Sequence, residues 1–348
     1  MAKTGIVRHR KFMEHWMGEY HPESPMRLEA IYAMLDEPEM AGMFLEIPVE
    51  PADKKDIMRV HSPGYVSKIE STAGVEYTYL DPDTHACAAS YDAAMLAAGG
   101  VCRAISMVHS GEIQNAFALV RPPGHHAEKA QAKGFCLFNN LAVGARYAQE
   151  TLRIGRILIV DWDLHHGNGT QHSFEEDPSV LYFSTHQYPY YPGTGAFDEV
   201  GRGRGKGFTV NVPLTIGHGD GEFLKIYQNL LRPIALEFQP ELILVSAGFD
   251  TFYGDPLGGM NVSSKGFAGL TRVIMDIAEA CCSGKVVLSL EGGYNVMGER
   301  DSVKEVLKEL AGLSFTNPEE LMALVNTEMT DSLASRVKSV QRAFWKSL

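Results

Sequence analysis

Six short apolar runs constrain the fold of this 348-residue chain more than any other feature. Each run is rich in Val, Ile and Leu and ends in polar residues or glycine. They span residues 5–8, 116–120, 157–160, 180–183, 242–246 and 286–290. Continuous apolar runs of this length indicate strands that are buried on both faces, as in a parallel sheet. We therefore predict a mostly parallel sheet at the centre of the protein.

Segments with helical periodicity lie between and after these runs. They span residues 91–109, 141–152, 223–238 and 267–280, followed by 302–310, 317–324 and 332–345. Strands that alternate with helices in this way are typical of a doubly wound α/β fold. We expect the last helices to cap the same domain. In open α/β sheets the chemistry lies beyond the carboxyl ends of the strands, which tells us where to look for a site.

Composition excludes several classes of protein. The net charge of −12 leaves no broad basic face for nucleic acid, although an acidic protein tolerates a cationic partner. We find no run of 18 apolar residues and no apolar signal core in residues 1–11, and hence expect no membrane partner. The five cysteines lack CxxC spacing, which favours reduced thiols over a zinc-thiolate site. These features predict a cytoplasmic protein.

The run 157–160 leads directly into the segment DWDLH, which carries Asp161, Asp163 and His165. Side chains two residues apart on an extended chain share one face. Carboxylate and imidazole groups together suit Zn²⁺ or a similar divalent ion. The spacing therefore predicts a metal site at the carboxyl end of this strand.

Three other runs also lead into polar residues. His125 and His126 follow a Pro-Pro-Gly turn, Asp250 lies just past a glycine, and Tyr294 follows two glycines, which predict a mobile loop tip. Histidine is a general acid or base near neutral pH, and a tyrosine hydroxyl can polarise a carbonyl. Asp250 is either a third metal ligand or a cap of a turn. The four strand ends together suggest a metal-assisted hydrolase.

The motifs RPPGHHA, DWDLHHGNGTQ, SAGFD and EGGYN resemble those of the zinc-dependent histone deacetylase family, in the same order along the chain. HPESPMRL near the start also resembles that family, and HHGNGTQ and GDPLGG are similar to its class II branch, especially class IIb. The similarity spans about residues 5–315. The resemblance implies an arginase-like three-layer fold, with one catalytic domain over 1–348 and a C-terminal helical segment at about 316–348.

The resemblance also implies a role for each motif residue. Asp163, His165 and Asp250 would hold one catalytic Zn²⁺. His126 would be the base toward the metal-activated water and later the acid toward the leaving amine. His125 would be held by Asp161 and act electrostatically. His126 would pair with Asn168, where class I members usually carry Asp, and its pKa should be lower as a result. Tyr294 would donate to the amide oxygen and then to the oxyanion.

A narrow tunnel for an acyl-lysine chain is the next implication. Gly134, Phe135, Tyr190, Tyr191, Leu257 and Gly293 match its positions. Which of the two tyrosines faces the tunnel stays open, because the local spacing departs from the family pattern. Members that prefer acetylpolyamines carry a glutamate where this chain has Leu257, so the resemblance favours acetylated lysine in a peptide as the substrate.

Structural K⁺ ions are a further implication of the resemblance. Asp161, Asp163, His165, Ser184 and Thr185 match one site, and Phe174, Asp177, Val180 and Phe208 match a second. Three alternatives to a lysine deacetylase remain at this stage. They are an acetylpolyamine deacetylase, a ureohydrolase with two Mn²⁺ ions, and a non-catalytic binder of acyl-lysine. The histidine at position 165 argues against the second, and the retained His126 and Tyr294 argue against the third.

Overall fold

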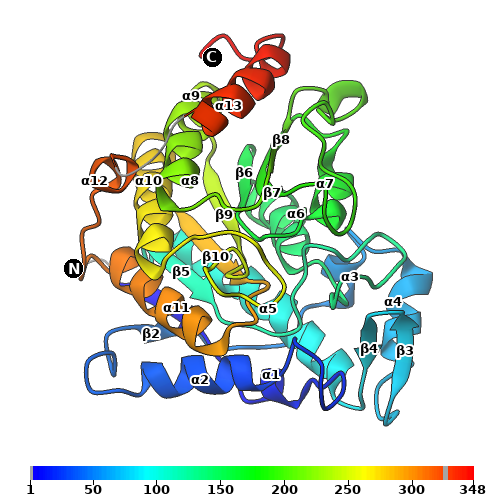
Figure 1. Ribbon diagram of the computed structural model, residues 1–348. Coiled ribbons are helices and arrows are strands. Elements are labelled where there is room, and N and C mark those ends of the chain that lie inside the picture. The colour runs from blue at the N-terminus through cyan, green and yellow to red at the C-terminus, as the bar shows by residue number, and fades with distance from the viewer. Residues whose placement is uncertain (1–2, 324–327) are drawn as a thin grey trace.

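The computed structural model describes residues 3–323 and 328–348 and is built around an eight-stranded sheet, flanked by helices on both sides (Figure 1). All pairs within this sheet are parallel, and the order is β2-β1-β5-β10-β9-β6-β7-β8. The strands are β1 (Thr4–Val7), β2 (Leu45–Glu46), β5 (Asn115–Ala118), β6 (Ile157–Asp161), β7 (Val180–Gln187), β8 (Thr209–Leu214), β9 (Leu242–Ala247) and β10 (Val286–Leu290). The predicted parallel α/β architecture is confirmed.

Each of the six predicted runs forms a strand of this sheet, and its two other strands, which the sequence missed, lie at the sheet edges. β2 has only two residues, and β8 contains Asn211 and Pro213. Proline cannot donate a hydrogen bond to a neighbouring strand, so an edge strand tolerates it where a central strand does not. A separate antiparallel hairpin, β3 (Thr78–Asp81) and β4 (Thr84–Ala86), stands apart from the main sheet (Figure 1).

Two groups of helices cover the sheet. α5 (Ser90–Ser110) contacts α6 (Asn140–Leu152), while α10 (Ser264–Cys282) contacts α11 (Val296–Leu310), which in turn contacts α2 (Met26–Leu35). The remaining helices before α10 are α1 (Lys11–Glu14), α3 (Lys54–Ile57), α4 (Pro63–Glu70), α7 (Asn168–Phe174), the 3₁₀ turn η1 (Gly203–Gly205), α8 (Asp220–Ile226), η2 (Tyr227–Leu231) and α9 (Arg232–Phe238). Of the described helices, one, α5, is long and apolar enough to cross a membrane. However, 78% of its most apolar stretch is buried inside the protein.

The helix predicted over 223–238 is interrupted. Its middle, η2, is a π-helical turn between α8 and α9. Pro233 lies at the start of α9 and lacks the N–H that an unbroken α-helix would donate four residues back. The proline therefore explains why the ladder shifts here.

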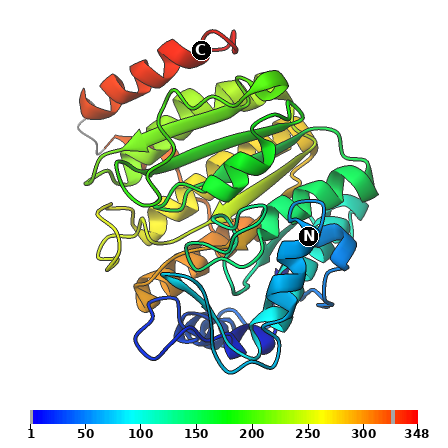
Figure 2. The ribbon, with the colours of Figure 1, turned by 90° about the vertical axis from the view of Figure 1, so that its right-hand side faces the viewer.

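The C-terminal helices are shorter than predicted or shifted. α12 spans Pro318–Met322, and residue 324 of the predicted helix lies outside the described residues. α13 (Glu328–Gln341) lies along the β8 edge of the sheet (Figure 2). Trp345, beyond this helix, is buried and donates from its indole N–H to Gly207 O at 3.0 Å.

The strand order brings the chemical motifs together. β10, β9 and β6 are consecutive neighbours, with Leu290 opposite Ala247 and Asp161 opposite Ser246. Their carboxyl ends therefore deliver the three motifs EGGYN, SAGFD and DWDLH to one place. β5, on the other side of β10, delivers RPPGHH to the same edge.

Candidate active site

Asp163, His165 and Asp250 converge at this edge of the sheet. Their donor atoms all lie within 4.8 Å of one another, and all three residues are buried. His165 Nδ1 lies 2.9 Å from Asp250 Oδ2 and 3.2 Å from Asp163 Oδ1. Among the described residues, no other group of three His, Cys, Asp or Glu side chains converges in this way.

The donor set fits a divalent cation. Burial and the neighbouring Asp163 carboxylate raise the pKa of Asp250, because two carboxylates this close repel each other without a cation between them. Backbone N–H groups fix the carboxylates from behind: Leu164 N donates to Asp250 Oδ1 at 2.7 Å, and Gly292 N donates to Asp163 Oδ2 at 2.9 Å. Two carboxylates and one imidazole are a ligand set that zinc accepts.

Glycines in the motifs make this close approach possible. A Cβ atom at Gly248 would lie 2.0 Å from Asp163 Oδ2, and one at Gly292 would lie 2.4 Å from Asp250 Oδ2. Both distances are too short for any side chain, so glycine is required there on steric grounds.

His125 and His126 lie next to this group, with ring centroids 4.0 Å apart. His125 Nδ1 lies 3.2 Å from Asp161 Oδ2, which also accepts from the Tyr182 hydroxyl at 2.9 Å. Burial alone would lower the pKa of His125, but the Asp163 and Asp161 carboxylates raise it to about 10. Asp161 thus points to His125 and does not belong to the converging group.

His126 has the opposite character. Its Nδ1 lies 2.7 Å from Asn168 Oδ1, at the first residue of α7. Burial, and then the positive charge of His125, lower the pKa of His126 well below its ordinary value. The ring is therefore neutral. The ring centroid of His126 is 5.9 Å from that of His165, so His126 lies beside Asp163, His165 and Asp250, which we call the metal group.

The loop that carries Tyr294 is held firmly, which corrects the expectation of a mobile tip. Tyr294 N donates to Asp255 Oδ2 at 2.7 Å, and Gly293 O accepts from Arg27 Nε at 2.7 Å. The Arg27 guanidinium also lies 5.3 Å from the centroid of the Tyr294 ring. Burial and the Asp250 carboxylate raise the pKa of Tyr294 well above its ordinary value, so the phenol stays protonated.

Sequence reasoning gave no role to the buried ion pairs behind this loop. Arg27 pairs with Glu299 at 2.6 Å and with Glu23 at 3.1 Å, and Glu23 also pairs with Arg121. None of the four side chains is exposed to solvent. Glu23 and Arg27 lie in HPESPMRL and Arg121 in RPPGHHA, so the motifs contained a signal although their spacing did not reveal the pairing.

Glu291 is a further residue to which the sequence analysis gave no role. Its carboxylate accepts from the backbone N–H groups of Gly124 at 2.6 Å and of His125 at 3.1 Å. It therefore ties the end of β10 to the loop of the paired histidines.

The aromatic residues that the sequence predicts to line a tunnel lie next to His126, His165 and Tyr294. The Phe135 ring is perpendicular to that of Tyr294 at 5.9 Å, and Tyr190 stacks on His165 at 5.7 Å. Tyr191 is perpendicular to His126 at 5.2 Å, with a buried hydroxyl. Tyr190 is 40% exposed, and its hydroxyl donates to Leu257 O at 3.0 Å. Both tyrosines thus border the site, with Tyr190 at the rim.

Two of the positions predicted for the tunnel are glycines in left-handed backbone conformations. Gly134 has φ +54° and Gly293 has φ +135°. A Cβ atom at Gly134 would lie 2.3 Å from His126 Cδ2, so this glycine allows the chain to pass directly beside the base.

Several residues of the two predicted potassium sites contact one another. Asp161 is opposite Ser184, and its carbonyl accepts from the Thr185 hydroxyl at 3.5 Å. In the second set, Phe174 O accepts from Asp177 N, Asp177 O accepts from Val180 N, and Phe208 O accepts from Tyr182 N. These contacts are compatible with the two sites, which stay predictions.

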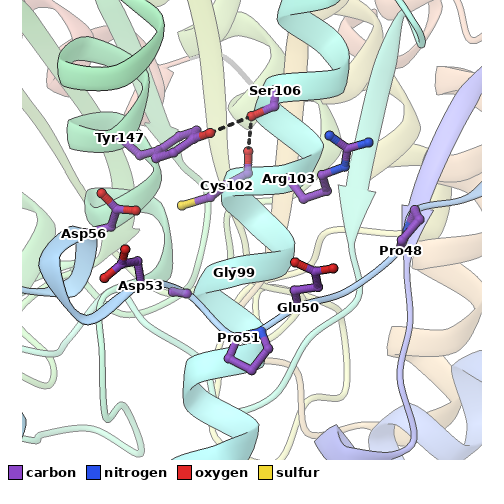
Figure 3. Close-up of a pocket in the computed structure, with 11 residues that line it drawn as sticks. Pro48, Glu50, Pro51, Asp53, Asp56, Gly99, Cys102, Arg103, Ser106 and Tyr147 are labelled. Carbon is purple, nitrogen blue, oxygen red and sulfur yellow. Dashed lines mark hydrogen bonds between the residues drawn. The ribbon is translucent and has the colours of Figure 1, made fainter.

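A separate hollow of about 380 Å³ lies against α5 (Figure 3). Its lining includes the carboxylates of Glu50, Asp53 and Asp56 and the guanidinium of Arg103. Among the described residues that line this hollow there is no histidine and no converging metal-binding group. We therefore place the chemistry at the sheet edge.

Comparison with known proteins finds a family model and several relatives that match most of this chain. The family model "Histone deacetylase domain" matches residues 21–310. Histone deacetylase 15 of Arabidopsis thaliana is 42% identical over 94% of this chain and 59% of its own length. Polyamine deacetylase HDAC10 of Danio rerio is 39% identical over 93% of this chain and 49% of its own. A probable deacetylase of Archaeoglobus fulgidus is 37% identical over 99% of both chains.

A solved structure is also similar to this chain over nearly its whole length. The crystal structure of the HDA15 HD domain matches with a TM-score of 0.93 and 39% identity, over 99% of this chain and 96% of that one. The chain spans about half the length of the plant and fish relatives and nearly the whole length of the archaeal one. This chain therefore belongs to the histone deacetylase family and is similar to its class II members.

Proposed function

We propose that this protein is a zinc-dependent deacetylase that hydrolyses N-ε-acetyl-lysine and releases acetate and the free amine. The buried convergence of Asp163, His165 and Asp250 beside a neutral His126 carries this proposal. Zn²⁺ held by these three residues would supply Lewis-acid polarisation of the amide carbonyl and acidify a water molecule.

His126 would move the proton. Its Nδ1 faces Asn168 Oδ1, so the proton of the neutral ring lies on Nδ1 and the lone pair lies on Nε2. Nε2 would take a proton from the attacking water and return it to the amine nitrogen as the C–N bond breaks. His125, held charged beside Asp161, would remain protonated and stabilise the negative charge that develops on the amide oxygen.

Tyr294 would donate its hydroxyl to the carbonyl oxygen as that oxygen becomes an oxyanion. The rings of Phe135, Tyr190 and Tyr191 would enclose the methylene chain of the substrate, since flat apolar walls suit a chain that ends in a neutral amide. These roles support a tunnel that delivers one acyl amide to the metal group.

An acetylpolyamine is the second candidate substrate, because polyamine deacetylases of Danio rerio and Homo sapiens are each 39% identical to this chain. Leu257 favours lysine instead, since an apolar side chain offers no counter-charge to the distal amine of a polyamine. We expect kcat/KM to be at least about tenfold higher for an acetyl-lysine peptide than for acetylspermidine. A higher value for acetylspermidine would contradict lysine specificity without affecting the deacetylase proposal.

Metal dependence tests the chemistry itself. We expect the protein to bind one zinc per chain at the metal group, to lose deacetylation when chelated, and to regain it on zinc addition. Metal content is measured by mass spectrometry and turnover by acetate release, with Asp250→Asn as the variant that should fail to regain activity. Retained turnover in the chelated protein would contradict the proposal.

Potassium binding and location are two smaller proposals. We propose that K⁺ occupies one or both of the predicted sites and stabilises the fold, so that Tm is higher in KCl than in NaCl of equal strength. We also propose that the protein is cytoplasmic, as its five free cysteines suggest. Cell fractionation would test the location.

A further inference from the structure

The partner of His126 is an amide whose two ends have opposite hydrogen-bonding character. Asn168 Oδ1 can only accept and lies 2.7 Å from His126 Nδ1, while Asn168 Nδ2 can only donate. Nδ2 points to Glu128 Oε1 at 2.5 Å and to the carbonyl of His126 at 3.3 Å. Nothing in the shape of an asparagine fixes this orientation, because the amide occupies the same space after a 180° flip.

The orientation decides which nitrogen of His126 is basic. With the amide oxygen toward the ring, the proton stays on Nδ1 and Nε2 carries the lone pair. With the amide nitrogen toward the ring, Nδ1 must accept, the proton moves to Nε2, and Nε2 can no longer act as the base. An imidazole in the wrong tautomer can lower kcat by up to roughly 10⁴-fold.

Glu128 distinguishes the two orientations. Burial would raise the pKa of Glu128, but hydrogen bonds from His172 and Asn168 lower it, so the group is a carboxylate that only accepts. It attracts the amide N–H₂ of Asn168 and would repel the amide oxygen of a flipped side chain. His172 Nδ1 contacts the same oxygen, Glu128 Oε1, at 2.9 Å.

Hydrogen bonds hold the backbone of Glu128, and contacts with Asn168 and His172 hold its carboxylate. Its N–H donates to Gln131 O at 2.9 Å, and its carbonyl oxygen faces His61 Nδ1 at 2.8 Å. The start of α7 packs closely on the residue after the histidine pair, because a Cβ atom at Gly169 would lie 2.2 Å from Ala127 O. Asn168 and Glu128 therefore face each other from two closely packed segments.

We propose that Glu128 is a positioning residue of the deacetylation reaction: it fixes the Asn168 amide with its oxygen toward His126 and so selects the tautomer whose Nε2 accepts the proton. This inference rests on the proposed function and extends it to a residue two positions beyond the histidine pair. Glu128 acts through Asn168 and has no contact with the reacting atoms in this scheme.

A double-mutant cycle with Asn168→Asp tests the proposal. Glu128→Ala should lower kcat at least about tenfold in the wild-type background, with a much smaller change in KM. In the Asn168→Asp background the same change should lower kcat less than about twofold, or raise it. An aspartate has no amide to orient, and Glu128 would repel it. Equal losses in the two backgrounds would show that Glu128 supports the fold only and would overturn the inference.

The ring nitrogens of His126 give a readout that needs no turnover. In the zinc-loaded wild-type protein, ¹⁵N chemical shifts should report the Nδ1–H tautomer, with the signal assigned by its loss in His126→Ala. Glu128→Ala should populate the Nε2–H tautomer. His172→Ala keeps the Glu128 carboxylate and should leave the Nδ1–H tautomer in place.

The two readouts separate this inference from the proposed function. A wild-type protein that releases no acetate from any acyl amine contradicts the function, while the spectra still decide the role of Glu128. An unchanged His126 tautomer in Glu128→Ala overturns the inference even where the wild-type protein is an active deacetylase.

Discussion

Gly134 lies so close to His126 that a side chain at this position would collide with the histidine ring. Its φ of +54° is left-handed, and a Cβ atom would lie 2.3 Å from His126 Cδ2. We predict that Gly134→Ala displaces the base and lowers kcat by about 10²-fold, because a shift of about 1 Å in a catalytic group has an effect of that size. Steady-state kinetics on an acetyl-lysine peptide would measure the loss.

Gly74 provides the matched control. It has φ +77° but no atom within 4 Å of a Cβ position. Gly74→Ala should therefore destabilise the protein by about 1–2 kcal/mol through backbone strain alone and leave kcat unchanged. Similar losses of kcat in both variants would mean that strain, and not the contact with His126, causes the effect.

The hydroxyl of Tyr294 is a second residue whose effect can be isolated. Tyr294→Phe removes the donor but keeps the backbone contacts of this residue with Asp255 and the aromatic contact with Phe135. We predict a fall in kcat of about 10²–10³-fold, with unchanged zinc content and little change in KM. A variant that keeps more than a tenth of the wild-type kcat would remove Tyr294 from the mechanism.

At the scale of elements, helix α2 holds the loop that follows β10. Arg27 on this helix donates to the carbonyls of Gly293 and Glu291 and pairs with Glu299 and Glu23. Arg27→Leu would leave the buried Glu299 carboxylate without its partner, while Glu23 would keep its pair with Arg121. We predict a loss of about 3–5 kcal/mol in the free energy of unfolding, as is usual when one member of a buried pair is removed, measured by urea denaturation.

Arg8→Leu is the control for this prediction. Arg8 also pairs with two carboxylates, Asp36 and Glu46, but their side chains are 67% and 60% exposed. Water already solvates these groups, so the variant should lose at most about 1 kcal/mol. Equal destabilisation by both variants would contradict the view that burial makes the Arg27 pairs important.

Elements with local signals could be predicted from the sequence, and those that depend on distant contacts could not. The runs 157–160 and 242–246 predicted buried strands because apolar residues there are continuous, and the polar residues that follow marked the site. The contact of Arg27 with Gly293 joins residues 266 positions apart, so no local pattern contains it. β8 was missed for a local reason, since its polar and proline residues suit an edge strand.

At the scale of the whole molecule, buried titratable groups set how stability depends on pH, and they oppose one another. Burial lowers the pKa of His15 to about 3 and of His61 and His166 to about 4, so each of these histidines destabilises the fold as pH falls below about 6.5. Burial raises the pKa of Glu291 and Glu299 to about 7. The protein therefore loses the stability that these two groups contribute as pH rises from about 4.5 to 7. The total curve mixes both signs, so single variants are needed to separate them.

The contribution of His61 to this pH dependence can be measured separately. Its Nε2 accepts from Asn139 N at 2.9 Å, a bond that a protonated ring cannot make. We predict that wild-type protein loses up to about 1.4 kcal/mol per pH unit relative to His61→Gln as pH falls from about 6.5 to 4, in urea unfolding curves. Parallel curves for wild type and His61→Gln would show that burial does not hold this histidine neutral.

His172→Gln should change the pH dependence in the opposite direction and at higher pH. The contact with Glu128 raises the pKa of His172, so wild-type protein should lose stability relative to this variant as pH rises above about 6.5.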